Sequence, residues 1–151
     1  MKSFVFNLQK VLRLRETQLE LEEARFKQQV AAVAELDRTR AQLEAAGVRA
    51  EAEVRKLPYM EGRDVAALGQ FRLGVQRQER DLAVRRAERQ RTLEKQQLVM
   101  LEARRRCRLL ERLRERQQAE WQADCDRELE ETASESFLAG WARGQRQADA
   151  P

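Results

Sequence analysis

The sequence predicts an all-α protein: one long two-helix antiparallel coiled coil, a helical hairpin, with a C-terminal helical overhang. Its composition is 42% hydrophobic and 37% charged over 151 residues, so much of the chain must stay in contact with water. Ala, Leu, Glu, Arg and Gln dominate, whereas Gly and Pro are scarce, which is typical of long helices that bury only a seam. Apolar residues also recur at heptad spacing in two long segments. We therefore expect a single domain over residues 1–151.

The first helix is predicted over residues 7–57, with Ser3 or Asn7 available as an N-cap. Steps of seven residues trace two rows of a coiled-coil seam. The apolar members of these rows are Leu12, Leu19, Phe26, Val33 and Val54, and Leu8, Leu36, Leu43, Ala50 and Leu57. Polar residues interrupt the rows at Arg15, Glu22, Gln29 and Arg40. Such residues can fix the register of a coiled coil, although they lower its stability.

A turn is predicted at residues 58–63, where the chain carries its strongest helix break. Pro58 opposes continuation of the first helix, Gly62 permits a left-handed conformation, and Asp64 can cap the helix that follows. The second helix is predicted over residues 64–138, with a frayed tail at 139–151. Its heptad-compatible apolar residues are Val65, Leu68, Val75, Leu82, Leu93, Met100, Ala103, Cys107, Leu110 and Trp121.

The two helices differ in length, and this difference predicts a part of the second helix without a partner. If residues 57 and 65 face each other, residue i of the first helix lies near residue 122 minus i of the second. The first helix then ends opposite Trp121. The chain beyond Trp121, here called the C-terminal overhang, retains Leu129, Phe137 and Trp141. Clustered apolar side chains of this kind usually mark a contact surface.

Several classes of function have no support in the sequence. The chain contains no His, no Gly-rich phosphate loop, no Cys or His set at metal-ligand spacing and no nucleophile elbow. We expect no enzyme activity, no catalytic residue, no bound metal and no cofactor. Cys107 and Cys125 are too far apart on one helix for a disulfide, and we interpret them as reduced thiols of a cytosolic protein. No apolar run is long enough to cross a bilayer.

Two arginine clusters allow a nucleic-acid interpretation, which we weighed against a solvated helix surface. The clusters are Arg85, Arg86, Arg89 and Arg91, and Arg104, Arg105, Arg106 and Arg108. Glutamates interleave with them, and no aromatic residue that could stack on bases lies between Phe71 and Trp121. We therefore expect no binding of nucleic acid.

The aromatic residues near the two chain ends leave two alternatives open. These residues are Phe4, Phe6, Trp121, Phe137 and Trp141. They could seal the open end of the hairpin, or they could dock with the overhang into a larger partner. Buried aromatic residues supply much of the binding energy at protein interfaces.

Three segments carry a family resemblance. The opening FVFNLQKVLRLRETQLELEEARF resembles the start of the flagellar export protein FliJ family, with its aromatic pair and Leu-Gln-Lys-Val-Leu core. The segment LGQFRLGVQRQERDL resembles the second helix of that family, and ELEETASESF resembles its usual ending. The N-terminal segment is the most specific of the three.

The resemblance implies a stalk-like hairpin that binds and activates the hexameric flagellar export ATPase FliI, contacts the membrane export gate FlhA and escorts export chaperones. The gate contact in the family falls on positions that match Phe71, Val75, Gln78 and Leu82 here, although Gln78 replaces a small or aliphatic residue. Heptad spacing also places Val75 and Leu82 in the seam. The residues expected to contact the ATPase are Phe4, Phe6, Trp121, Leu129 and Phe137.

The implied location is the cytoplasm, with peripheral association at the inner face of the cell membrane through partners only, and the free protein is expected to be a monomer. Two alternatives remain. One is the equivalent stalk of a virulence type III secretion system. The other is a homo-oligomeric coiled-coil scaffold without an ATPase partner, in which polar seam residues specify a four-helix dimer.

Overall fold

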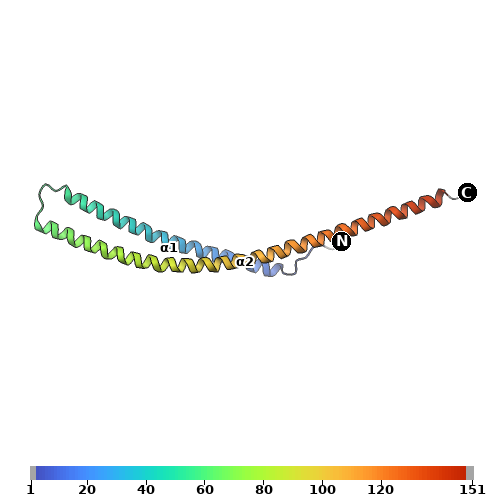
Figure 1. Cartoon of the computed structure of the whole chain (residues 1–151), viewed down its shortest axis with the longest axis horizontal. Coiled ribbons are helices and arrows are strands. Elements are labelled where there is room, and N and C mark those ends of the chain that lie inside the picture. The colour runs from blue at the N-terminus through green and yellow to red at the C-terminus, as the bar shows by residue number, and fades with distance from the viewer. Residues whose placement is uncertain (1–2, 149–151) are drawn as a thin grey trace. The chain divides into compact units, whose positions relative to one another are not determined.

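The computed structural model describes residues 3–148, and all regular structure in this range is helical. Helix α1 spans Gln9–Arg55, with 47 residues, and helix α2 spans Gly62–Ala148, with 87 residues. The two long helices pack against each other (Figure 1), which confirms the predicted all-α helical hairpin. Within the described range, neither helix has a stretch long and apolar enough to cross a membrane.

Contacts divide the chain into two compact units. The hairpin unit consists of Thr17–Arg104 and contains most of α1, the turn and the first half of α2. The terminal unit consists of Met1–Glu16 and Arg105–Pro151 and contains the start of α1 and the rest of α2. Each unit is described by itself.

In the hairpin unit, side-chain pairs between α1 and α2 define the antiparallel register. The Arg72 Nε atom lies 2.9 Å from Glu51 Oε1, and Arg86 Nε lies 2.6 Å from Asp37 Oδ1. The expected partner positions for residues 51 and 37 were 71 and 85, one residue from those observed. The register that was predicted from the position of the turn is therefore confirmed in this unit.

The seam of the hairpin unit combines apolar burial with polar links. Val33 of α1 and Met100 of α2 are buried. Glu22, a predicted polar interruption, is only partly exposed, and Gln96 donates from its Nε2 atom to both the backbone oxygen and the carboxylate of Glu22. A buried polar group that lacks such a partner lowers stability. Glu22 is thus accommodated by a specific partner on the opposite helix.

The turn lies at residues 56–61, two residues earlier than predicted. The expectation that Gly62 adopts a left-handed conformation is wrong: it is the first residue of α2, and no glycine among residues 3–148 has a positive φ. Asp64 lies in the first turn of α2 and stabilises the start of the helix, because its carboxylate accepts a hydrogen bond of 3.0 Å from the Glu61 backbone N–H. Leu57 and Val65, predicted to face each other in the seam, are both exposed because they lie at the turn, and Leu8 at the other end of the predicted row is exposed as well.

Helix α2 ends later than predicted. It continues through the expected tail to Ala148 rather than ending near residue 138. Gly140 and Gly144 do not interrupt it, because a glycine costs a helix only about 1 kcal/mol relative to alanine and propagation of an existing helix is cooperative. Residues 149–151, the last part of the expected tail, lie outside the described residues. At the other end, α1 begins at Gln9, two residues after Asn7.

The terminal unit holds the most deeply buried side chains of the described chain. Leu12 is 1% exposed, and Phe6, Cys107 and Cys125 are also buried. The segment before α1 contributes to this core, since Phe6 precedes the helix and the Phe4 ring lies 6.0 Å from the Trp121 ring, centroid to centroid. The N-terminal segment therefore covers part of α2 where α1 is absent.

Leu12 gives a direct test of this core. Replacing Leu12 with Ala should lower the free energy of unfolding by about 2–5 kcal/mol, because it removes a fully buried side chain and leaves a cavity. Urea unfolding followed by circular dichroism at 222 nm measures the change. Leu14→Ala is the matched control: the side chain is exposed, so the same substitution should change stability by less than about 0.5 kcal/mol. Equal effects of the two substitutions would contradict the burial of Leu12.

Candidate interaction surfaces

The four residues expected at the export-gate contact line two successive grooves of the hairpin unit. Phe71 and Val75 belong to a groove of about 330 Å³ that is also lined by Gly47, Glu51, Arg72 and Gln76. Gln78 and Leu82 belong to a groove of about 280 Å³ that is also lined by Thr39, Leu43, Asp81 and Arg85. Both grooves combine side chains of α1 and α2. The four positions are thus brought together along one part of the hairpin.

Exposure separates these four residues into two classes. Val75 and Leu82 are half-buried, which agrees with their places in the predicted seam. Gln78 is exposed, and Phe71 is 41% exposed although it is a large apolar residue. Phe71 is therefore the apolar side chain of this set that a partner can reach most readily.

An ion pair beside Phe71 positions the helix that carries it. The Glu51 carboxylate of α1 lies 2.9 Å from Arg72 of α2 and 3.8 Å from Arg55 of its own helix. Because Arg72 is the next residue after Phe71, this pair links α1 to α2 beside Phe71. Exposed ion pairs of this type contribute little stability, so the link is weak.

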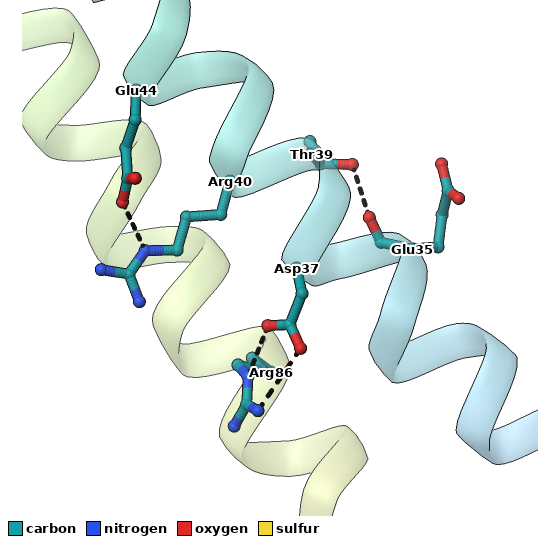
Figure 2. A network of polar contacts seen from close by, with 6 residues as sticks. All are labelled: Glu35, Asp37, Thr39, Arg40, Glu44 and Arg86. Atoms are coloured by element: carbon teal, nitrogen blue, oxygen red, sulfur yellow. Dashed lines mark hydrogen bonds and ion pairs between the residues drawn. The ribbon is translucent and has the colours of Figure 1, made fainter.

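A second ion pair between the helices lies in the middle of the hairpin unit (Figure 2). Asp37 on α1 accepts two hydrogen bonds from the Arg86 guanidinium on α2, at 2.6 and 3.4 Å, while Arg40 on α1 turns to Glu44. The hydrogen bond from Arg86 is the largest cause that lowers the pKa of Asp37, and the charges of Arg86 and Arg40 lower it further. Partial desolvation acts in the opposite direction.

The arginine clusters considered for nucleic acid contain residues that pair with acids of α1. Arg86 binds Asp37, and the Arg104 guanidinium lies 2.9 Å from Glu23. These two members of the clusters link the helices of the hairpin and contribute less free positive charge than the sequence suggests. Within residues 3–148, no group of three or more His, Cys, Asp or Glu side chains is placed to hold a metal ion.

The five residues expected at the ATPase contact divide into buried and exposed members. Phe6 is buried, and Phe4 and Trp121 are partly buried against each other. These three aromatic residues pack within the terminal unit. Leu129 and Phe137, in contrast, are 54% and 72% exposed. Of the two alternatives for the end aromatics, burial within the chain applies to Phe4, Phe6 and Trp121. Phe137 remains accessible to a partner.

The exposed part of the overhang is larger than the predicted contact residues suggest. All residues at positions 126–145 are exposed. They include Leu138 and Trp141, which were not among the expected ATPase contacts, and Trp141 is 58% exposed. The early end predicted for α2 placed Trp141 in a frayed tail and so concealed its place on the same helix as Phe137.

Burial limits access to the thiols of both cysteines. Cys107 and Cys125 are both buried. Burial raises the pKa of the Cys107 thiol, and the nearby carboxylates of Glu111 and Glu16 raise it further; its Sγ lies 3.7 Å from Glu111 Oε1. A raised pKa lowers the fraction of nucleophilic thiolate. The Cys107 thiol therefore serves packing.

Comparison with known proteins found no matching family model, no matching curated protein and no matching solved structure.

The Asp37–Arg86 pair predicts a specific titration. Because the pKa of Asp37 is lowered in the folded state, the pair stabilises the fold above the pKa of Asp37 in the unfolded chain. This stabilisation is lost as the pH falls through the lower, folded value. Arg86→Gln should raise the pKa of Asp37 toward its usual value, as measured by NMR titration of the side-chain carboxyl carbon. Arg38→Gln is the control: Arg38 pairs with Glu35 on α1, so its loss should leave the pKa of Asp37 unchanged.

Proposed function

We propose that this chain is a component of flagellar protein export: a stalk-like helical hairpin that binds and activates the hexameric export ATPase. In this role it also contacts the membrane export gate and escorts export chaperones, working in the cytoplasm at the inner face of the cell membrane through its partners. The proposed function requires no catalytic residue, metal or cofactor.

The observation that carries the proposal is the exposed helix of the C-terminal overhang. Leu129, Phe137 and Trp141 lie on a helical segment that is exposed to solvent among the described residues 3–148. Covering these residues in a partner would release a few kcal/mol, since a fully buried large apolar side chain contributes about 1.5–3 kcal/mol. The resemblance of residues 4–26 to the start of the FliJ family supports the choice of an export ATPase as that partner.

The proposed mechanism is a shift in conformational populations. A helix that enters the centre of a ring contacts several subunits, and it favours the ring over separate subunits if it binds only the assembled state. It activates turnover if it binds some subunit conformations more tightly than others. The chain needs no chemistry of its own for this, only a rigid helix with apolar contacts at its exposed end.

Two alternatives are distinguished by specific observations. A stalk of a virulence secretion system has the same properties, and neighbouring genes for needle-complex proteins would favour it over flagellar export. A homo-oligomeric scaffold would form a stable dimer through the faces of the hairpin even at low concentration, which light scattering would detect.

Activation of the ATPase is the first test of the proposal. The purified chain should raise ATP hydrolysis by the export ATPase of the same genome and shift it toward the hexamer in size-exclusion chromatography. Replacing Leu129 and Phe137 with Ala should weaken the interaction roughly 30-fold if they supply about 2 kcal/mol, the value typical of interface hot spots. Leu98→Ala, an exposed apolar residue of the hairpin unit, is the control and should activate normally. Unchanged turnover and assembly with the native chain would contradict the proposal.

Binding to the export gate is the second test. Phe71→Ala should weaken binding to the cytoplasmic domain of the gate protein in calorimetry while helix content stays the same. Leu73→Ala is the matched control, because Leu73 is similarly exposed and lies two residues away on a different face of α2. If both variants bind as the native chain does, the role of Phe71 is structural only.

A further inference from the structure

A row of apolar side chains with four-residue spacing runs along α2 through the terminal unit. Its members are Trp121, Cys125, Leu129, Ala133, Phe137 and Trp141. The first two are covered within the chain, since Trp121 packs on Phe4 and Cys125 is buried. The last four, here called the ridge, are exposed. Because four residues exceed one turn of an α-helix, the row winds gradually around α2, and the ridge lies on a different side of the helix from Trp121.

The spacing of the ridge determines the kind of helix that fits on it. Side chains four residues apart form a line inclined to the helix axis, and two helices that interlock such lines cross at about −50°. The seam of the hairpin unit has heptad spacing instead, which suits helices that run nearly alongside each other. The ridge thus favours a crossing helix over a continuation of the coiled coil.

Small residues lie beside the ridge and form a shallow groove. They follow each ridge residue by three positions: Thr132, Ser136, Gly140 and Gly144. A Cβ atom added to Gly140 or Gly144 would meet nothing within 4 Å, so packing inside the chain does not require glycine at either position. Glycine also weakens a helix. The same face therefore offers both a line of large residues and a groove that can accept one.

We propose that the ridge is covered by the ridge of a second copy of this chain, in an antiparallel crossing centred near residues 136 and 137. A face that carries both ridge and groove is complementary to itself, which is the requirement for a twofold-symmetric contact. The Phe137 ridge of one copy enters the glycine groove of the other, and the reverse contact forms at the same time.

Charge selects the antiparallel direction. Residues 126–135 carry Asp126, Glu128, Glu130, Glu131 and Glu135 against a single arginine, whereas Arg143 gives the later part of the helix positive charge. In an antiparallel pair the acidic half of each helix lies toward the basic end of the other. A parallel pair would place the two acidic halves together, where like charges repel.

The size of the ridge makes this dimer weak. An aromatic side chain buries roughly 150–250 Å² when fully covered, and more than half of Leu129, Phe137 and Trp141 is exposed. Covering the ridge therefore removes a few hundred Å² per copy, below the roughly 800 Å² per partner of a stable interface. We expect dissociation at about tens of micromolar, which distinguishes this contact from the stable dimer of a scaffold.

The self-contact and the proposed ATPase contact use the same side chains, so they exclude each other. Self-pairing covers Leu129, Phe137 and Trp141 in the free protein and releases them when the chain is diluted or a tighter partner binds. The self-contact itself does not depend on the identity of that partner, and it is tested on the chain alone.

Sedimentation velocity at increasing concentration tests the dimer. The native chain should change from monomer to dimer between about 1 and 500 µM. Gly140→Leu should raise the dissociation constant at least tenfold because the new side chain fills the groove. Gly74→Leu is the matched control: Gly74 also lies in α2 with open space around its Cβ position, and both substitutions raise helix propensity. A native chain that stays monomeric throughout, or equal dimerisation of the two variants, would overturn the proposal.

Disulfide trapping tests the direction of the helices. Ala133→Cys mixed with Gly140→Cys should give a linked heterodimer faster than either variant alone gives a homodimer, since positions 133 and 140 face each other in the antiparallel crossing. The native chain measures the background from its two buried cysteines. Faster linkage of Ala133→Cys to itself would show a parallel pair and overturn the antiparallel arrangement.

Discussion

Two helices that face only each other can bury one stripe of side chains apiece, and this constraint controls the rest of the structure. The hairpin unit buries Val33 and Met100 and leaves many large apolar residues half-covered. Since apolar burial is limited, polar contacts across the seam define the alignment of the helices. Glu51 with Arg72 and Asp37 with Arg86 hold the same register at two separate points. Matched charges thus accompany apolar contact in the alignment of the two helices, at a small gain in stability.

The unequal lengths of the helices have a chemical consequence as well as a geometric one. Helix α1 has 47 residues and α2 has 87, so the N-terminal segment must cover what α1 does not reach. Phe4 does this at Trp121, and from position 126 to position 145 the side chains of α2, including its large apolar residues, are exposed. Phe137 and Trp141 are 72% and 58% exposed, so burial within the described part of the chain stabilises them little. The contacts outside the chain that we propose would bury them.

Heptad spacing and the position of Pro58 were sufficient to predict the fold, the register and the central part of the seam, whereas Leu8, Leu57 and Val65 at the ends of the predicted rows are exposed. The buried Leu12 and Val33 and the partly buried Glu22 all lie in the predicted rows. Features set by single backbone groups were harder to predict. The start of α2 at Gly62 is stabilised by the hydrogen bond between Asp64 and the Glu61 backbone. Its end at Ala148 reflects the small cost of Gly140 and Gly144 in a helix that is already formed. For the candidate sites, heptad spacing placed Val75 and Leu82 correctly in the seam. The sequence left open whether Phe6 is buried within the chain or free to bind a partner, because a non-helical segment has no periodic signal.

The contact between Gln96 and Glu22 also constrains how this sequence can change over time. Gln96 donates to both the backbone oxygen and the carboxylate of Glu22, and that carboxylate also lies 2.9 Å from Arg25. Any residue at position 22 keeps the backbone oxygen as an acceptor for Gln96, whereas an apolar residue at position 96 removes the partner of Glu22 on the opposite helix. Change at these positions should therefore be asymmetric: among orthologues, loss of the amide at position 96 should accompany loss of the carboxylate at position 22 more often than the reverse, although 74 positions of chain separate them.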